Sequence, residues 1–453
     1  MLTVPISIVK NIPPFDAKDY FANNPSKCDA SKYHVFSIDD AKLLFGHRDI
    51  YIWGAGQKGR GFCMALLRCG FTVKAFLDSN LQEVGEEFMN IKTIHPNTLL
   101  DEPNLLTNAF VLTASVESKN REMYSLLDKV GMIKGKDYVG IQTLSPFYPT
   151  IEVAGLCNLK CSSCIRSDTE IIENGKYMSL LDYSKVIKKM ITEIPFLYLV
   201  DLYVFGEPML NNDLPNIIML NNELGIASGL STNLNNIRNL EAVLRAQPAQ
   251  LRVSLSGASK ETYEVTHTGG RWDKVSRNLI KLGEISNSLG NKTIIEIYFH
   301  LYQHNKSEIK IISDLCKKYG FRFHPSLAVL FSDYALSYSE SGVMNSNAKN
   351  ASDLMLIDID TLLDDCKREE HLNCILTRVV PVVNWDLSVM PCCNYTYSSI
   401  SKNYLDVSLD EIISKRTNSH VCAKCQKHSL HRWNNQIAYA AKVKEVILEN
   451  NEM

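Results

Sequence analysis

The sequence predicts an α/β protein, and three observations support this. Apolar, β-branched segments alternate with segments of helical period along most of the chain, which is typical of parallel sheets covered by helices. A glycine-rich turn follows the first strand, and two groups of cysteines come later. We therefore expect a lead-in, an N-terminal βαβ domain, a longer βα series, a small cysteine-rich domain and a final helix. Their predicted ranges are 1–47, 48–146, 147–335, 336–430 and 431–453.

Bulk composition excludes several classes of function. The chain has 453 residues, 45% of them hydrophobic, with 48 basic and 50 acidic residues. No basic run suits nucleic-acid phosphates, so no nucleic-acid partner is expected. No segment reaches the roughly 18 apolar residues of a membrane helix, and the first residues lack the pattern of a signal peptide. We expect a cytoplasmic protein without a membrane partner.

The N-terminal domain carries a possible phosphate-binding turn. A strand runs into Gly54, Gly56 and Gly59, a G-x-G-x-x-G pattern that opens a helix and can place a pyrophosphate at the helix N-terminus. Asp78 ends the next strand about twenty residues later, where a ribose partner belongs. Residues 48–142 resemble the small Rossmann-like domains of sugar-modifying enzymes, which implies a bound nucleotide or nucleotide sugar. The alternative is an interaction domain with no ligand.

The second domain is predicted from repeated βα units. Expected strands are 150–155, 198–204, 226–230, 250–255, 293–301 and 321–329. Expected helices are 179–192, 213–224, 236–246, 271–289 and 306–319. Six units fall short of the eight of a closed barrel, so a partial (β/α)6 barrel is expected. The polar, aperiodic segment 331–352 is interpreted as a linker or flexible loop, and 353–368 as a helix.

The first cysteine group predicts a metal centre. Cys157, Cys161 and Cys164 follow a predicted strand and belong to a loop. Thiolates suit iron–sulfur clusters and zinc. A structural zinc site needs four ligands, whereas three thiolates leave one iron of a 4Fe–4S cluster open. The alternative is a zinc site completed by residues from elsewhere.

With these cysteines, residues 148–430 resemble the radical SAM superfamily. This resemblance implies that the open iron chelates S-adenosylmethionine (SAM), whose reductive cleavage gives methionine and a 5′-deoxyadenosyl radical. The segment Phe205–Pro208 resembles the Gly-Gly-Glu-Pro motif, with Phe205 in place of the first glycine. In that role Gly206 and Glu207 bind the methionyl amine. Ser163 stands where the family often has an aromatic residue.

Further SAM-binding residues follow from the same resemblance. Ser231 and Asn233 belong to a segment like the family's Thr-Asn-Gly strand end, and Ser254 to one like its Ser-Leu-Asp-Gly strand, which reaches the ribose and carboxylate. Either His267 or Arg271 pairs with the methionyl carboxylate, and the choice stays open. His300, on the fifth strand, is a candidate for a catalytic role in substrate binding or proton transfer. The alternative is a satisfied polar side chain.

The second cysteine group lies between residues 374 and 425. Cys422 and Cys425 are spaced so that both can face one metal. The region resembles the SPASM and Twitch extensions, with Leu387 where their hairpin usually has glycine. The number of cysteines in this region suits the Twitch form, which carries one auxiliary cluster. It implies an auxiliary 4Fe–4S cluster on Cys374, Cys392, Cys422 and Cys425, with Cys393 spare. The rival interpretation is zinc, with help from His428 and His431.

These features together predict a radical SAM enzyme. We expect hydrogen abstraction from a sugar, a sugar nucleotide or a related polar small molecule, in an oxidation or rearrangement. The auxiliary cluster would accept an electron, and a partner such as flavodoxin or ferredoxin would supply electrons. One alternative is a radical SAM maturase that modifies a peptide or protein. Another is a zinc-stabilised, non-catalytic binding module.

Overall fold

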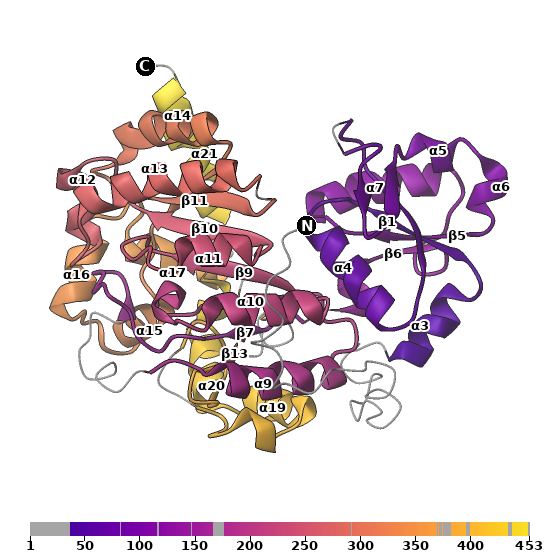
Figure 1. Cartoon of the computed structure of the whole chain (residues 1–453). Coiled ribbons are helices and arrows are strands. Elements are labelled where there is room, and N and C mark those ends of the chain that lie inside the picture. Colours follow the sequence, from indigo (N-terminus) through magenta and orange to yellow (C-terminus); the bar gives the residue numbers. More distant parts are fainter. Residues whose placement is uncertain are drawn as a thin grey trace. The chain divides into compact units, whose positions relative to one another are not determined.

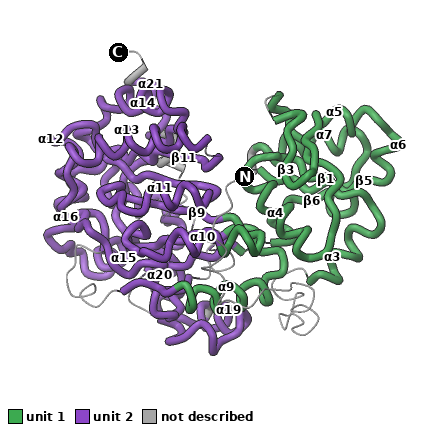
Figure 2. Tube along the Cα trace, in the orientation of Figure 1, with its two compact units in different colours: residues 1–147, 180–199, 220–227 green, residues 148–179, 200–219, 228–453 purple. Residues whose placement is uncertain are grey.

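The computed structural model falls into two compact units, which are described separately (Figure 2). Unit 1 comprises residues 1–147, 180–199 and 220–227, and unit 2 comprises 148–179, 200–219 and 228–453. The residues described are 37–81, 83–115, 117–145, 147–165, 176–290, 292–368, 370, 374, 382–395, 399–433 and 437–451. Among them, no helix is long and apolar enough to cross a membrane.

Unit 1 contains a six-stranded sheet in the order β3-β4-β2-β1-β5-β6 (Figure 1). Its strands are β1 (Asp49–Trp53), β2 (Val73–Leu77), β3 (Glu87–Phe88), β4 (Ile91–Ile94), β5 (Ala109–Thr113) and β6 (Tyr138–Gly140). All neighbouring pairs are parallel except β3 and β4. Counted along the chain, the five parallel strands lie in the order 3-2-1-4-5, so the winding direction reverses between β1 and β5.

The helices of unit 1 differ in burial, and longer ones such as 38–45 and 57–68 bury apolar residues. They are α3 (Ile38–Phe45), α4 (Gln57–Arg68), α5 (Asn97–Leu100), α6 (Pro103–Leu106), α7 (Glu117–Lys129), α8 (Ile141–Leu144) and α9 (Leu180–Glu193). The expected loose lead-in over 1–47 is wrong for its last part, because residues 38–45 form helix α3. Ser37 and Asp40 cap it reciprocally, and Phe45 packs edge-on against Phe71 and Phe110. Residues 1–36 lie outside the described part.

Unit 2 contains an eight-stranded open sheet in the order β12-β11-β10-β9-β8-β7-β13-β14. Its strands are β7 (Thr150–Ile151), β8 (Leu199–Asp201), β9 (Ala227–Thr232), β10 (Gln250–Leu255), β11 (Ile294–Leu301), β12 (Arg322–Leu327), β13 (Val382–Val383) and β14 (Val389–Met390). Each of β7 to β12 lies within its predicted range, except that β9 runs two residues beyond 226–230, to Thr232. The predicted α/β class with parallel sheets is confirmed, while the partial barrel and the domain ranges stay predictions.

Helices follow the strands of unit 2 as the βα pattern predicts (Figure 1). They are η4 (Pro208–Leu210), α10 (Leu214–Glu223), α11 (Leu240–Arg245), α12 (Lys260–Thr266), α13 (Trp272–Ser288), η5 (Lys306–Glu308) and α14 (Ile309–Tyr319). Burial alternates strictly along β10 and β11, where every second side chain is fully buried. The half-buried positions in between form the inner face of the sheet, and several of them carry polar side chains.

The expected linker at 331–352 is wrong, because this segment forms two helices. Helix α15 (Ser332–Ser341) ends at Gly342 in the left-handed conformation, and α16 (Ser346–Ser352) begins where Asn345 accepts a hydrogen bond from the amide of Ala348 at 2.8 Å. Tyr334 and Ala335 are buried in a hydrophobic cluster. Tertiary burial therefore orders a segment whose own sequence is polar.

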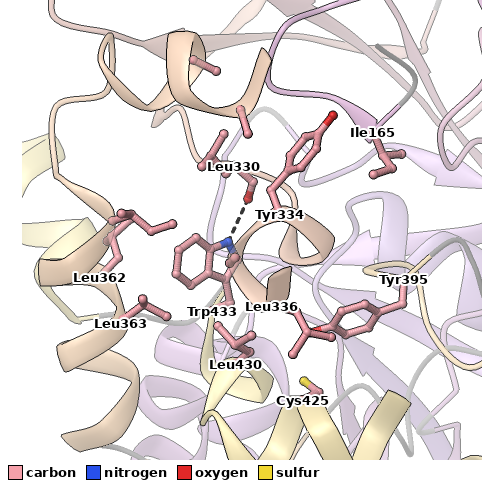
Figure 3. Packing of buried hydrophobic residues seen from close by; sticks show 14 of the residues in the cluster. Ile165, Leu330, Tyr334, Leu336, Leu362, Leu363, Tyr395, Cys425, Leu430 and Trp433 are labelled. Carbon is pink, nitrogen blue, oxygen red and sulfur yellow. Dashed lines mark hydrogen bonds between the residues drawn. The ribbon is translucent and has the colours of Figure 1, made fainter. Parts of the chain in front are cut away.

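The C-terminal region completes unit 2. Strand β13 pairs with β7 in parallel and with β14 in antiparallel orientation. The helices are α17 (Ile359–Arg368), η6 (Tyr404–Asp406), α19 (Leu409–Thr417), α20 (His420–Lys427), η7 (Leu430–Arg432) and α21 (Ile437–Asn451). In the cluster of Figure 3, Trp433 packs near Leu362 and donates from its indole nitrogen to the carbonyl of Leu330 at 2.9 Å.

Candidate functional site

The loop of the first cysteine group follows β7 and is fixed by the turn that follows β8. The Glu152 carboxylate accepts hydrogen bonds from the amides of Phe205 and Gly206, both at 2.9 Å. A side chain at Gly206 would overlap the carbonyl of Ala154. The Glu207 amide donates to the carbonyl of Leu156 at 2.8 Å, directly before the first cysteine. The two predicted motifs are thus brought together by backbone contacts that require glycine.

The three cysteine thiols of this loop influence one another electrostatically. Burial, followed by the nearby Cys164 and Cys157, raises the pKa of the Cys161 thiol well above its ordinary value. The Asn233 amide lies 3.7 Å from the Cys157 sulfur. Within the described residues, no three His, Cys, Asp or Glu side chains converge on one point as ligands of a single ion do. Three thiols that influence one another electrostatically are a donor set that suits a soft metal centre.

Glu207 lies beneath this loop and is buried. Its two carboxylate oxygens accept the amides of Met209 at 3.0 Å and Asn233 at 2.8 Å. Burial raises its pKa to about 7, although the hydrogen bonds from Asn233, Met209 and Thr232 act in the opposite direction. The carboxyl group therefore organises the ends of β8 and β9. Binding of a methionyl amine by Glu207 stays a prediction.

A cavity of about 530 Å³ opens on the inner face of the sheet in unit 2. This volume lies in the range of small-molecule sites. Five residues predicted from the sequence line it, namely Cys161, Ser231, Ser254, His267 and His300. The hydroxyls of Ser231 and Ser254 are 3.4 Å apart on neighbouring strands. The structure thus gathers residues from a loop, three strands and a turn around one space.

Other predicted residues do not line this cavity. Asn233 instead donates to the side-chain oxygen of Asn158 at 3.0 Å, next to the cysteine loop. Arg271 is exposed and pairs with Asp273 at 3.1 Å. His267 lines the cavity, but burial lowers its pKa to about 4, and it stacks on Tyr263 with ring centroids 4.5 Å apart. A neutral ring offers hydrogen bonds but no charge, so the partner of a methionyl carboxylate stays open.

His300 is held neutral on the cavity wall. Burial, and after it the positive charge of Arg252, lowers its pKa to about 3. Strand register places it opposite Ser326 of β12. At neutral pH the ring can accept or donate one hydrogen bond, but its low pKa makes it a weak base. A substrate-binding role suits this geometry better than proton transfer, and either role stays a prediction.

Sequence reasoning missed the polar group deeper in the same cavity. Arg252 of β10 places its guanidinium 3.6 Å from the ring centroid of Tyr298 of β11. Tyr203, after β8, is hydrogen-bonded to both Arg252 and Asp201. Burial raises the pKa of Asp201 to about 6. The sequence did contain a signal for Arg252. Side chains alternate between the two faces of a strand, so Arg252, two residues before Ser254, lies on the same face as Ser254.

The structure also brings the cysteines of the second group close to one another. Burial raises the pKa of Cys425 to about 12; a hydrogen bond with Tyr395 opposes this rise, whereas the nearby Cys374 and Cys422 add to it. Burial likewise raises the pKa of Cys392, and Cys425 is among the neighbours that contribute. The four predicted ligands are therefore electrostatic neighbours, a donor set that suits a soft metal centre. Residues 375–381 of the resembling hairpin region lie outside the described part of the chain.

The hairpin between β13 and β14 has two notable features. One concerns Leu387, which stands where SPASM and Twitch hairpins usually have glycine, and the other concerns packing on the first cysteine loop. Leu387 has a φ of 70°, in the left-handed region that favours glycine. The indole of Trp385 occupies the space where a Cβ of Gly155 would lie, two residues before Cys157. Glycine at position 155 is therefore needed for the hairpin to pack on the backbone that leads into the cysteines.

The glycine turn of unit 1 has the backbone geometry that its pattern predicts. Gly54 has a φ of 117°, and Gly59 packs so closely on Gly54 that a Cβ would overlap its carbonyl. Gly56 begins α4 without any side-chain cap and with open space around it. Asp78 accepts the amide of Ala55 at 2.8 Å, so this carboxylate stabilises the turn itself. Its predicted ribose contact stays a prediction.

Comparisons with known proteins find similarity in structure alone. No protein-family model matches the chain, and the curated proteins give no match. BtrN in complex with AdoMet and 2-DOIA aligns over 65% of this chain and 95% of its own, at 15% identity and a TM-score of 0.39.

Two other solved structures align to a similar extent. Streptococcus suis SuiB aligns over 69% of this chain and 74% of its own, at 12% identity and a TM-score of 0.40. The structure of anSMEcpe with bound AdoMet aligns over 67% and 92%, at 16% identity and a TM-score of 0.42. Because these scores lie below 0.5, the function of this chain has to be argued from its own residues.

Proposed function

We propose that this chain is a radical SAM enzyme that acts on a sugar, a sugar nucleotide or a related polar small molecule. One observation carries the proposal: Cys161 of the three-cysteine loop lines the same cavity as Ser231 and Ser254. A cluster bound to that loop would therefore face the space in which the hydroxyls of both strands meet. The polar inner face of the sheet is unlike the packed apolar interior of a purely structural barrel.

Cys157, Cys161 and Cys164 would hold a 4Fe–4S cluster, which when bound supplies the electron that cleaves SAM. The chain's own residues bind, orient and shield the reactants. Ser231 and Ser254 offer hydroxyls for a ribose or carboxylate. Apolar residues on the cavity wall, including Leu330, exclude water from the space beside the cluster.

Cys374, Cys392, Cys422 and Cys425 would hold an auxiliary 4Fe–4S cluster. Four thiolates leave no open iron, so such a cluster would serve electron transfer rather than substrate binding. This role favours an oxidation, in which the substrate loses a proton and an electron after hydrogen abstraction. A flavodoxin- or ferredoxin-type protein would supply electrons to the first cluster.

The test is anaerobic reconstitution of the full chain with iron and sulfide. We expect about eight iron atoms per chain, two clusters of four. Reduction in the presence of SAM should release 5′-deoxyadenosine. Bound zinc with no cleavage of SAM would instead support a zinc-stabilised binding module and would overturn the proposal.

Cysteine variants separate the two centres. Cys161→Ala should remove about four irons and abolish SAM cleavage, whereas Cys422→Ala should remove about four irons and leave SAM cleavage without substrate intact. Cys316→Ala is the matched control, because this buried cysteine lies on α14, outside both groups. It should keep the full iron content. Equal iron loss in Cys316→Ala and Cys161→Ala would show that the loss reflects misfolding.

A further inference from the structure

We infer that the Arg252 guanidinium binds a carboxylate or phosphate group of the substrate on the inner wall of the cavity in unit 2. The inference deepens the proposed function, on which it rests, by giving the substrate a chemical class. The substrate would be an acidic polar molecule, such as a sugar acid or a phosphorylated sugar, rather than a neutral alcohol.

The charge of the cavity wall is the first support. Among the described residues that line the cavity there is no Asp, Glu or Lys, and Arg252 is the one Arg. The two histidines of the wall, His267 and His300, have pKa values lowered by burial to about 4 and about 3. At neutral pH the wall therefore carries one positive charge among hydroxyl groups. The same charge that disfavours protonation of His300 attracts an anion.

The geometry of Arg252 is the second support. One face of its guanidinium lies on the ring of Tyr298, which leaves the N–H groups at its edge for hydrogen bonding. The side chain donates to the hydroxyl of Tyr203, yet its buried Nε has no hydrogen-bond partner. A buried donor without a partner is costly, and a planar carboxylate or a phosphate would satisfy it in a bidentate manner.

Two carboxylates lie near Arg252 without lining the cavity. Glu296 of β11 is opposite Arg252 in the strand register and accepts a hydrogen bond from the side chain of Gln250 at 2.9 Å. Burial raises the pKa of Asp201 to about 6, so its carboxylate is mostly ionised at neutral pH. It does not line the cavity, and it accepts hydrogen bonds from the hydroxyls of Tyr148 and Tyr203. Ser231 lies opposite Arg252 in the strand register. Its hydroxyl can donate a further hydrogen bond to an anion held by the guanidinium.

Depth in the sheet separates this anion from the carboxylate of SAM. Arg252 lies two residues before Ser254 on β10, about 6.6 Å further from the C-terminal end of the strand. The cysteine loop follows the C-terminal end of β7. SAM bound to that loop would occupy the outer part of the cavity, and the inner position is left for the substrate.

The experiment measures anion binding to the reconstituted full chain by isothermal titration calorimetry, with and without saturating SAM and always without reductant. The probes are inorganic phosphate and acetate, and the tighter of the two tells which anion the site prefers. Arg252→Gln should weaken binding by about tenfold or more, and Arg252→Lys should retain part of it. Arg245→Gln should bind as the wild type does, because Arg245 is exposed on α11 and pairs with Glu241.

Three results would overturn the inference: equal binding by Arg252→Gln and wild type, no binding of either anion by wild type, or loss of binding whenever SAM is present. The last would assign Arg252 to the carboxylate of SAM. Release of 5′-deoxyadenosine without substrate is measured in parallel for the wild type and for Arg245→Gln, which should both show it. If the wild type fails in that assay but binds anions through Arg252, the proposed function fails while the anion site remains.

Discussion

Glu207 is a buried carboxyl group whose burial makes stability depend on pH. Its pKa is about 7 in the folded chain, against an ordinary value of 4.5. Between these pH values the folded state binds more protons than the unfolded state, so the free energy of unfolding contributed by this group falls as pH rises from about 4.5 to about 7. Glu207→Gln removes this contribution. We expect the variant to gain stability relative to wild type across that window, measured by urea unfolding at a series of pH values.

Glu241→Gln provides the control for this pH series. Glu241 is exposed on α11, where it pairs with Arg245. Its replacement should leave the slope of unfolding free energy against pH that Glu207 produces unchanged, because the buried carboxyl of Glu207 is still present. A Glu207→Gln variant with the same slope as wild type would show that Glu207 does not titrate in this window.

Single residues of the site were predictable where a motif carried them. Cys161 was predicted from the cysteine spacing, and Ser231 and Ser254 from segments that resemble family motifs; all three line one cavity. Arg252 and Tyr298 were missed because their contact joins residues on different strands, and only the parallel register of β10 and β11 brings them together. No local pattern in the sequence states that register. The low pKa values of His267 and His300 likewise arise from burial, which depends on the whole fold.

At the scale of elements, the N-terminus of α4 allows a sharp test of the predicted nucleotide site. Gly56 caps this helix at a φ of −74° with nothing near its missing Cβ, so a side chain fits without strain. Asp is a favourable N-cap, but its carboxylate would occupy the place of a phosphate and repel it. Gly56→Asp should keep or raise the melting temperature and abolish binding of ADP and UDP-glucose to the full chain, measured by equilibrium dialysis.

Gly56→Ser separates charge from bulk at the same position. Serine caps a helix as well as aspartate does but carries no charge, so nucleotide binding should persist in this variant. If the wild-type chain binds neither ADP nor UDP-glucose, the glycine turn serves the fold alone. The Asp78 hydrogen bond to the amide of Ala55 would then be its main role.

Elements with a regular hydrophobic pattern and clear boundaries were predictable from the sequence. Elements whose formation depends on burial against distant parts of the chain were not. Strands β10 and β11 have alternating burial that follows their sequence pattern. Helix α15 was taken for a loop because its serines mask any apolar stripe, yet Tyr334 and Ala335 are buried against other parts of unit 2. Helix α12 was missed because it has seven residues, too few for a period to show.

At the scale of the whole molecule, the chain divides differently from its sequence pattern. Residues 180–199 and 220–227 group with the N-terminal residues in unit 1, although their βα pattern continues the series of unit 2. Phe62 of α4 stacks on Phe196, with ring centroids 6.1 Å apart. Such a grouping could not be predicted, because it depends on contacts between residues more than a hundred positions apart and no repeat marks them.

Arg68 at the end of α4 is central to the grouping of unit 1. Its guanidinium donates to the carbonyls of Pro195, Leu197, Leu224 and Gly225, at distances of 2.5–3.1 Å. Arg68→Met keeps much of the apolar stem but removes every donor. We expect a loss of roughly 2 kcal/mol in the free energy of unfolding, because these carbonyls lose their partner. Amide hydrogen exchange over 180–199 should accelerate.

Arg60→Met is the matched control, since Arg60 belongs to the same helix and has one ion pair, with Glu83 at 2.8 Å. A partly exposed pair of this kind contributes about 1 kcal/mol or less, so this variant should unfold almost as the wild type does. The exchange rates over 180–199 should also stay unchanged, because Arg60 donates to no carbonyl there. Equal destabilisation by both variants would mean that α4 responds to any loss of charge, and Arg68 would then have no special role in unit 1.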